Sequence, residues 1–252
     1  GSAKFQISGL TGNATTTGTS NIFIGADAGY LNTTANGNVI IGTNGLNGAT
    51  NGGTNTGVGA SVLGQVTGTG NTGVGYFAGY RATTGHWNTA MGYNALVGAT
   101  SGTTFKQTLA VGANAGFSLS SGHDNTFVGF NSGYNTREGS SNVYLGAYSG
   151  NDSSRGFGNV FLGYGAGGKE TESNKLYIHN SSTDQPLIYG EFDTSTLQIN
   201  GGTRITGNLQ IDGSIITNGS IGITQDVSIV IQQVPEIIKT LSFKNGILVQ
   251  II

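Results

Sequence analysis

The segments Asn21-Ile-Phe-Ile-Gly25, Asn38-Val-Ile-Ile-Gly42 and Asn55-Thr-Gly-Val-Gly59 share one signature: asparagine, two further residues, an aliphatic residue and glycine. The signature occurs nine times, once with Thr108 in place of asparagine, and its glycines advance by 16, 17 or 20 residues. Self-similarity at a nearly constant period indicates a repeat protein whose units stack on one another. The signature glycines are Gly25, Gly42, Gly59, Gly75, Gly92, Gly112, Gly129, Gly146 and Gly163.

Each copy of the signature predicts a short β-strand. The residue before the glycine is apolar in every copy, and the residue two places earlier is mostly β-branched, as in Val39-Ile-Ile41. This spacing and composition are typical of one strand face, so we expect these two positions to face the core. The position between them would then point outward. It carries an aromatic residue in Phe23, Phe127, Tyr144 and Phe161, which predicts a packing partner outside the coil.

The predicted fold is all-β: a parallel β-solenoid with coils of about 17 residues. Stacked coils place equivalent residues about 4.8 Å apart, so the asparagines would form a ladder in which each side-chain amide bonds the next. Small residues after the glycine, as in Ala28-Gly29 and Ala166-Gly167, would let a second wall of the coil approach closely. The interior looks thin for a single chain, so we expect three rods to pack as a homotrimer.

The composition narrows the function classes. The chain has 252 residues, and its 46 glycines do not recur at every third position as collagen requires. A net charge of −2 provides no basic patch for nucleic acid. The absence of cysteine excludes thiolate metal sites. No apolar run approaches the roughly 18 residues that predict membrane insertion. We expect no cofactor.

Four regions are predicted along the chain. Residues 1–20 form a leading or capping segment, and residues 21–168 form the solenoid. Residues 169–213 form a narrow shaft of short alternating strands intertwined between several chains. Residues 214–252 are the most apolar, with a strand at 227–234 and a hairpin whose tip is Asn245-Gly246. The predicted shaft strands lie at 176–179, 186–192, 196–200, 203–206 and 208–212.

The signature, followed in most copies by Ala-Gly or Ser-Gly, resembles the head repeats of trimeric autotransporter adhesins. That resemblance implies a left-handed parallel β-roll trimer, although those repeats are usually a few residues shorter. The segment from Leu176-Tyr-Ile-His-Asn180 to Ile199-Asn-Gly201 also resembles a segment of bacteriophage tail fibres and of surface proteins of Bacteroidetes-like bacteria. Autotransporter adhesins continue into a coiled-coil stalk and a membrane barrel. No heptads or barrel strands follow here, which favours a phage-type fibre.

Residues that carry chemistry are sparse. His86, His123 and His179 do not lie at metal-ligand spacing from another histidine or a carboxylate. Glu170 and Glu172 lie among lysines at a change of composition and are interpreted as part of a solvated linker. The sequence contains no recognisable pairing of a nucleophile with a base. We therefore predict no catalytic residues, no metal site and no enzymatic activity.

Binding is the better prediction. Trp87, the only tryptophan, lies close in sequence to Tyr80 and His86. Aromatic faces suit the apolar faces of sugar rings, so these three residues are the predicted ligand-binding set. The alternative is that they cover the edge of the solenoid or a seam between subunits.

The sequence thus predicts a structural and host-attachment fibre of a phage tail or phage-like particle, located in the virion. Its partners would be two further copies of the chain, a host cell-surface glycan or protein, and other fibre or virion proteins. A trimeric adhesin on a bacterial cell surface is the alternative. Ice binding by Thr56, Thr72, Thr89 and Thr126 is less favoured, because the expected parity points these side chains inward.

Overall fold

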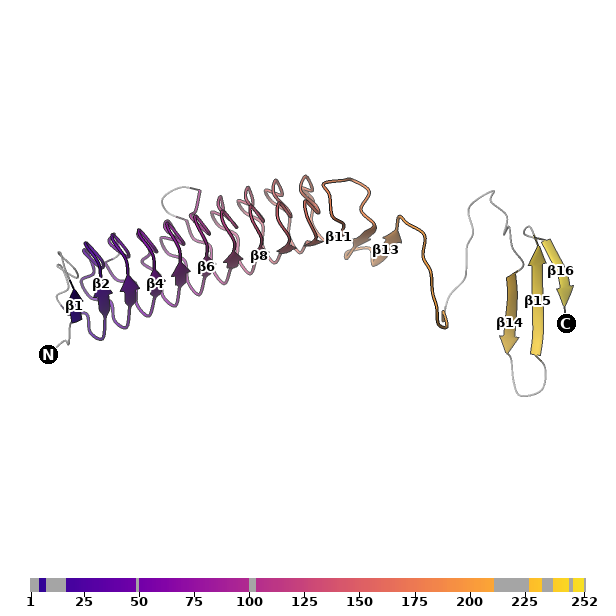
Figure 1. Cartoon of the computed structure of the whole chain (residues 1–252), viewed down its shortest axis with the longest axis horizontal. Coiled ribbons are helices and arrows are strands. Elements are labelled where there is room, and N and C mark those ends of the chain that lie inside the picture. The colour runs from indigo at the N-terminus through magenta and orange to yellow at the C-terminus, as the bar shows by residue number, and fades with distance from the viewer. Residues whose placement is uncertain are drawn as a thin grey trace. The chain divides into compact units, whose positions relative to one another are not determined.

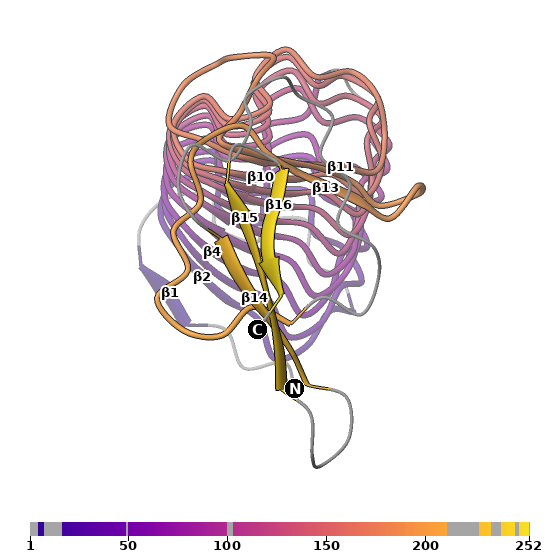
Figure 2. The same ribbon diagram turned by 90° about the vertical axis from the view of Figure 1, so that its right-hand side faces the viewer.

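The computed structural model describes residues 5–7, 17–48, 50–99, 103–210, 227–232, 238–244 and 247–251. The chain divides into two compact units, Gly1–Thr203 and Arg204–Ile252. In Figure 1 the first unit is a row of coils stacked along one axis, and in Figure 2 the coils of this unit overlie one another. All elements of the described residues are β-strands, which confirms an all-β solenoid with coils of about 17 residues.

One sheet runs the length of the first unit, with its strands in chain order. Its strands are β1 (Phe5–Ile7), β2 (Ile22–Ile24), β3 (Val39–Ile41), β4 (Thr56–Val58), β5 (Thr72–Val74), β6 (Thr89–Met91), β7 (Leu109–Val111), β8 (Thr126–Val128), β9 (Val143–Leu145), β10 (Val160–Leu162), β11 (Lys175–Ile178), β12 (Ile188–Glu191) and β13 (Thr196–Ile199). Strands β1 to β11 pair in parallel, and each residue lies beside its equivalent in the next coil, as Phe23 lies beside Ile40.

The faces of the strands are opposite to the sequence prediction. The middle residue of each strand from β2 to β10 points into the core: Ile40 and Phe127 are fully buried. The flanking residues Ile22 and Ile41 are 42% and 40% exposed. Ile24, Ile41 and Val58 do form one column, through pairs in register, but this column lies outside the core.

The physical reason is that both faces of these strands are apolar. Alternation and β-branching identify which positions share a face, but they do not identify the inner face when the opposite face is equally apolar. The turn after each glycine decides which face is buried, because this turn brings buried residues such as Ala28 and Leu46 over the middle position of the strand. The aromatic middle residues therefore belong to the core rather than to an outer row.

Large residues of the core come from either of two walls. Where the strand carries Phe127, the facing turn carries Gly133, and a Cβ there would lie 2.7 Å from the phenylalanine ring. Where the strand carries Gly73, Val62 and Leu63 fill the space, and a Cβ on Gly73 would lie 2.6 Å and 3.1 Å from them. In these two coils a large residue on one wall faces a small residue on the other, as close packing favours, whereas Ile40 and Leu46 are both buried in the coil of β3. In the later coils the ring of Tyr144 stacks on that of Phe161 with a centroid distance of 4.7 Å.

The signature asparagines form a buried ladder beside the strands. The Oδ1 of Asn142 accepts the backbone N–H of Asn159 at 2.9 Å, and its Nδ2 donates to the carbonyl of Gly156 at 2.8 Å. The predicted ladder therefore exists, but its main bonds join side chains to backbone. Direct amide-to-amide bonds occur as well, as from Asn88 to Asn71 at 3.0 Å.

The signature glycines form the corner after each strand. Gly25 has a φ of +125°, and a Cβ on it would lie 2.6 Å from the carbonyl oxygen of Gly42 in the next coil. A side chain would thus be both strained and in collision with backbone, which explains why glycine occupies this position in all nine copies.

The solenoid ladder extends past residue 168. Strand β11 pairs in parallel with β10, and β12 and β13 then add antiparallel strands. All four residues of β13 are exposed, including Leu197 at 66%. Within the described residues, 203–210 form no strand, and the intertwining of the segments 203–206 and 208–212 between several chains stays a prediction.

The second unit contains one antiparallel sheet of β14 (Val227–Gln232), β15 (Ile238–Lys244) and β16 (Ile247–Ile251). These strands confirm the predicted strand and hairpin near the C-terminus, with an irregularity between Ser242 and Phe243. The predicted turn at Asn245-Gly246 lies outside the described residues, as do parts of the leading segment and residues 211–226.

Candidate ligand-binding site

The candidate site is a hollow of about 400 Å³ on the turns that follow β5, β6 and β7. We call it the aromatic hollow. Because successive turns repeat the same backbone path, side chains at equivalent positions converge on one surface. The lining residues are Tyr76, Phe77, Tyr80, Arg81, Tyr93, Asn94, Val97 and Phe117.

The aromatic rings of the hollow are packed against one another. Tyr76 and Tyr93 follow the signature glycines of adjacent coils, and their rings are stacked at 5.5 Å with an interplanar angle of 13°. Phe77 lies edge-on to Tyr76 at 4.3 Å and to Tyr80 at 4.6 Å. These contacts hold two nearly parallel tyrosine rings, 45% and 54% exposed, at the surface.

A single cation borders the rings. The Cζ of Arg81 lies 5.8 Å from the centroid of the Tyr80 ring, which is within the range of a cation–π contact. Its Nη1 donates a long hydrogen bond of 3.5 Å to the carbonyl of Gly98. No carboxylate forms an ion pair with Arg81 among the residues that the structure describes.

The structure divides the three predicted binding residues between two places. Tyr80 lines the aromatic hollow, whereas Trp87 and His86 do not. Trp87 is 63% exposed, and its ring lies 5.7 Å from that of His86. The Nδ1 of His86 accepts the backbone N–H of Thr69 at 3.0 Å, so this histidine is part of the contact between coils.

Sequence reasoning missed Tyr76, Phe77, Tyr93 and Arg81 as members of one site. A signal was present: the residue after the signature glycine is alanine or threonine in five coils and aromatic in four, with tyrosine in two consecutive coils. The next position is mostly asparagine or another small residue, and Phe77 and Tyr148 depart from that rule. When equivalent positions of two adjacent coils both depart from the repeat, their side chains lie next to each other on one surface. A comparison of equivalent positions along the sequence therefore reveals such a surface.

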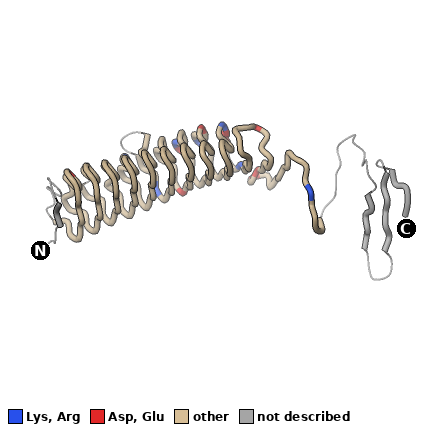
Figure 3. The backbone as a smooth tube through the Cα atoms, viewed as in Figure 1, with Lys and Arg blue, Asp and Glu red and all other residues tan. Residues whose placement is uncertain are grey.

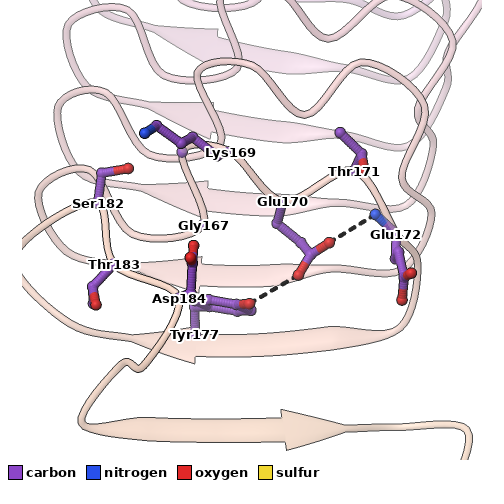
Figure 4. A pocket seen from close by; sticks show the side chains of 10 residues that line it. Gly167, Lys169, Glu170, Thr171, Glu172, Tyr177, Ser182, Thr183 and Asp184 are labelled. Atoms are coloured by element: carbon purple, nitrogen blue, oxygen red, sulfur yellow. Dashed lines mark hydrogen bonds between the residues drawn. The ribbon is translucent and has the colours of Figure 1, made fainter.

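A second hollow, of about 370 Å³, lies at the end of the solenoid (Figure 4). Its carboxylate Glu170 accepts the hydroxyl of Tyr177 through Oε2 and the backbone N–H of Glu172 through Oε1, both at 2.8 Å. The interpretation of Glu170 as part of a solvated linker was therefore incomplete, because it closes the end of the aromatic core. Burial, with the adjacent Glu170, raises the pKa of the Tyr177 hydroxyl well above its usual range.

A charged cluster joins β11 to β12 beside this second hollow. The Nζ of Lys175 lies 2.9 Å from Oε1 of Glu191, which also accepts the hydroxyl of Tyr189 at 2.6 Å. These hydrogen bonds, from Tyr189 first and then Lys175, lower the pKa of Glu191 to about 2. The hydrogen bond with Glu191 raises the pKa of Lys175 above its ordinary value.

Charged residues are unevenly distributed along the first unit. Figure 3 shows few of them on the early coils and more toward β11. No aspartate or glutamate occurs between Asp27 and Asp124, whereas Arg81 and Lys106 lie in that interval. The described residues contain no cluster of three or more histidine, aspartate or glutamate side chains placed to hold a metal ion. Within the same residues, no helix is long and apolar enough to cross a bilayer.

Comparison with known proteins gives no match, whether against family models, curated proteins or solved structures.

Proposed function

We propose that this chain is the rod of a homotrimeric attachment fibre, of the kind carried by a phage tail or a phage-like particle. The observation that carries the proposal is a straight apolar stripe on the outward face of the solenoid sheet. The rod would hold receptor-binding surfaces at fixed spacing, and multivalent attachment through three copies would strengthen weak individual contacts.

The outer stripe consists of the first and third residues of β2 to β10. None of these residues is charged, and the in-register pairing makes two straight columns. The column of third residues is apolar throughout, whereas the column of first residues has threonine in β4, β5, β6 and β8. Single exposed apolar residues are ordinary, but a continuous row of them marks an interaction surface. The residues of the stripe are Ile22, Ile24, Val39, Ile41, Thr56, Val58, Thr72, Val74, Thr89, Met91, Leu109, Val111, Thr126, Val128, Val143, Leu145, Val160 and Leu162.

The size of the stripe suits a shared interface. Nine strands spaced about 4.8 Å apart, each about 10 Å long, give an area on the order of 400 Å². A stable interface buries about 800 Å² per partner, so the stripe would form the apolar centre of a contact that needs further area. Strand β13 offers such area, because Leu197 and Ile199 are exposed on a strand that ends the sheet.

A trimeric adhesin of a bacterial surface would use the same rod. A membrane anchor encoded after this segment in the full-length gene would favour that alternative. Both functions need the same assembly of three chains.

The test is the mass of two matched double variants in solution. Val58→Lys with Val74→Lys places two charges in the stripe, and Thr50→Lys with Ser121→Lys places two charges on exposed turns away from it. We expect the stripe variant to fall to the 25.6 kDa mass of one chain, while the control keeps three times that mass. Equal masses for the two variants would contradict the use of the stripe.

Ice binding is a second candidate, because the threonines that the sequence predicted to point inward lie on the outer face of the sheet. Thr56, Thr72 and Thr89 point outward in three consecutive coils, about 4.8 Å apart. A monomeric rod would leave this flat array open to ice, whereas a trimer built on the stripe would cover it. Thermal hysteresis by the purified chain, lost in Thr72→Lys, would favour ice binding; its absence would remove this candidate.

A further inference from the structure

We propose that the aromatic hollow binds a carboxylated saccharide, with a sugar ring on Tyr76 and Tyr93 and its carboxylate on Arg81. The inference gives the proposed attachment function a ligand class and a site. The binding itself requires one chain only, so it can be tested apart from the trimer.

The platform is the first part of the argument. Tyr76 and Tyr93 are stacked at 5.5 Å and about half exposed, so they present neighbouring aromatic surfaces from adjacent coils. The C–H-rich face of a sugar ring packs on such surfaces, while its hydroxyl groups remain free to bond at the rim. A hollow of about 400 Å³ has the size expected for a small ligand of one or two sugar residues.

The backbone of Phe77 is the second part. Its φ of 55° lies in the left-handed region, which is strained for a residue other than glycine, asparagine or aspartate. Asp27, Asn44 and Asn94 occupy the equivalent position in other coils with nearly the same φ, and Tyr148 is a second aromatic residue there. This conformation is strained for either aromatic residue. Its edge-on contacts with Tyr76 and Tyr80 set the positions of both tyrosine rings.

The charge is the third part. Arg81 has five N–H donors, of which the bond to Gly98 uses one. Asp27 and Asp124 are the nearest carboxylates in the sequence on either side, and neither pairs with Arg81. A guanidinium binds a carboxylate through two parallel hydrogen bonds, so the geometry of Arg81 suits an anionic sugar better than a neutral one. Asn94, at the same hollow, offers an amide donor and acceptor for hydroxyl groups.

The experiment is a calorimetric titration of the full chain with three saccharides: 3′-sialyllactose, digalacturonic acid and lactose. The first two carry carboxylates on different sugar frameworks, and lactose is the neutral control. We expect at least one carboxylated saccharide to bind with a Kd at least tenfold below that for lactose. No binding of either acidic saccharide at concentrations of about 10 mM would overturn the proposal, because weak single-site affinities lie near 1 mM.

Variants locate the binding. Arg81→Met should weaken the acidic saccharide at least tenfold and at least fivefold more than it weakens lactose, whereas Tyr93→Ala should weaken both alike. Arg137→Met is the matched control, because Arg137 is exposed on a later coil and does not line the hollow. Should Tyr93→Ala lose its circular dichroism spectrum, Tyr93→Leu removes the ring with less loss of volume. An unchanged affinity in Arg81→Met, or an equal loss in Arg137→Met, would contradict the site.

The mass of the same samples separates the two proposals. A monomer that binds the acidic saccharide through Arg81 would overturn the trimeric fibre and support the hollow. A trimer that binds neither acidic saccharide would overturn the hollow and leave the fibre intact.

Discussion

The coils built on β4 to β7 and the coils built on β8 to β10 share one backbone path but fill their cores in opposite ways. In the first group the strand contributes Gly57, Gly73, Ala90 and Ala110, and Val62, Leu63 and Leu96 from the facing turns occupy the space. In the second group the strand contributes Phe127, Tyr144 and Phe161, and the facing turns carry glycine.

This difference shows that the coil does not depend on one particular core residue. The asparagine ladder, the corner glycines and the backbone bonds between coils are common to both groups, and they fix the path of the chain. Core volume is then supplied by either wall. A repeat of this kind tolerates large changes at one position when a second position changes with it.

The largest expected effect comes from truncating the aromatic core of the second group. Tyr144→Ala removes a fully buried ring that stacks on Phe161 and donates to Ser153 Oγ. Loss of a buried aromatic side chain costs about 3 to 5 kcal/mol of unfolding free energy. Phe157→Ala, which removes an aromatic residue that is 51% exposed, is the control and should change stability little. Similar denaturation midpoints for the two variants would show that Tyr144 is not in the core.

A coil of the second group can be converted to the core arrangement of the first group by exchanging large and small residues between strand and turn. Phe127→Ala alone should cost about 3 to 5 kcal/mol, because it leaves a cavity. Adding Gly133→Leu reproduces the arrangement of Ala90 with Leu96, which tolerates a φ of 48°. The double variant should regain at least about 1 kcal/mol of the unfolding free energy in urea, because leucine refills the cavity. A double variant no more stable than Phe127→Ala would refute exchange of volume between the walls.

The asparagine ladder is common to both groups, and one coil already lacks it at Thr108. Asn142→Thr removes the acceptor for the N–H of Asn159 and the donor to Gly156. Unsatisfied buried backbone groups cost about 1 to 3 kcal/mol each, so thermal unfolding should move to lower temperature. Asn47→Thr, on an outer turn, is the matched control. An unchanged unfolding temperature in Asn142→Thr would mean that water replaces both bonds.

The smallest effect concerns the end of the solenoid and depends on pH. The pKa of Glu191 falls from 4.5 to about 2 on folding, so its contribution to stability is complete above pH 4.5 and is lost as pH falls toward 2. The pKa of Lys175 is raised by the same bond, so its contribution is lost only at strongly alkaline pH. Glu191→Gln should therefore destabilise the chain at pH 7 more than at pH 3. Equal destabilisation at both pH values in urea titrations would contradict this account.

The sequence was sufficient for the solenoid, because the repeat of asparagine, aliphatic residue and glycine reports the backbone path directly. It was insufficient for the strand face, because Ile22 and Phe23 are both apolar and the decision depends on a turn several residues later. That error also placed Thr56 and its equivalents in the core. Of the three residues predicted to bind a ligand, Tyr80 lines the hollow, but Trp87 lies elsewhere because the coil separates residues that are close in sequence. The partners of Tyr80 come from other coils.

The most direct measurement of the central claim is small-angle X-ray scattering of the unaltered chain, which gives mass and length together. Side-by-side packing through the outer stripe predicts three times the 25.6 kDa mass. The rod within that particle would keep the solenoid length of about 50 Å expected for eleven parallel strands. A mass of one chain, or a particle of triple mass whose solenoid part is about three times as long, would contradict packing through the stripe.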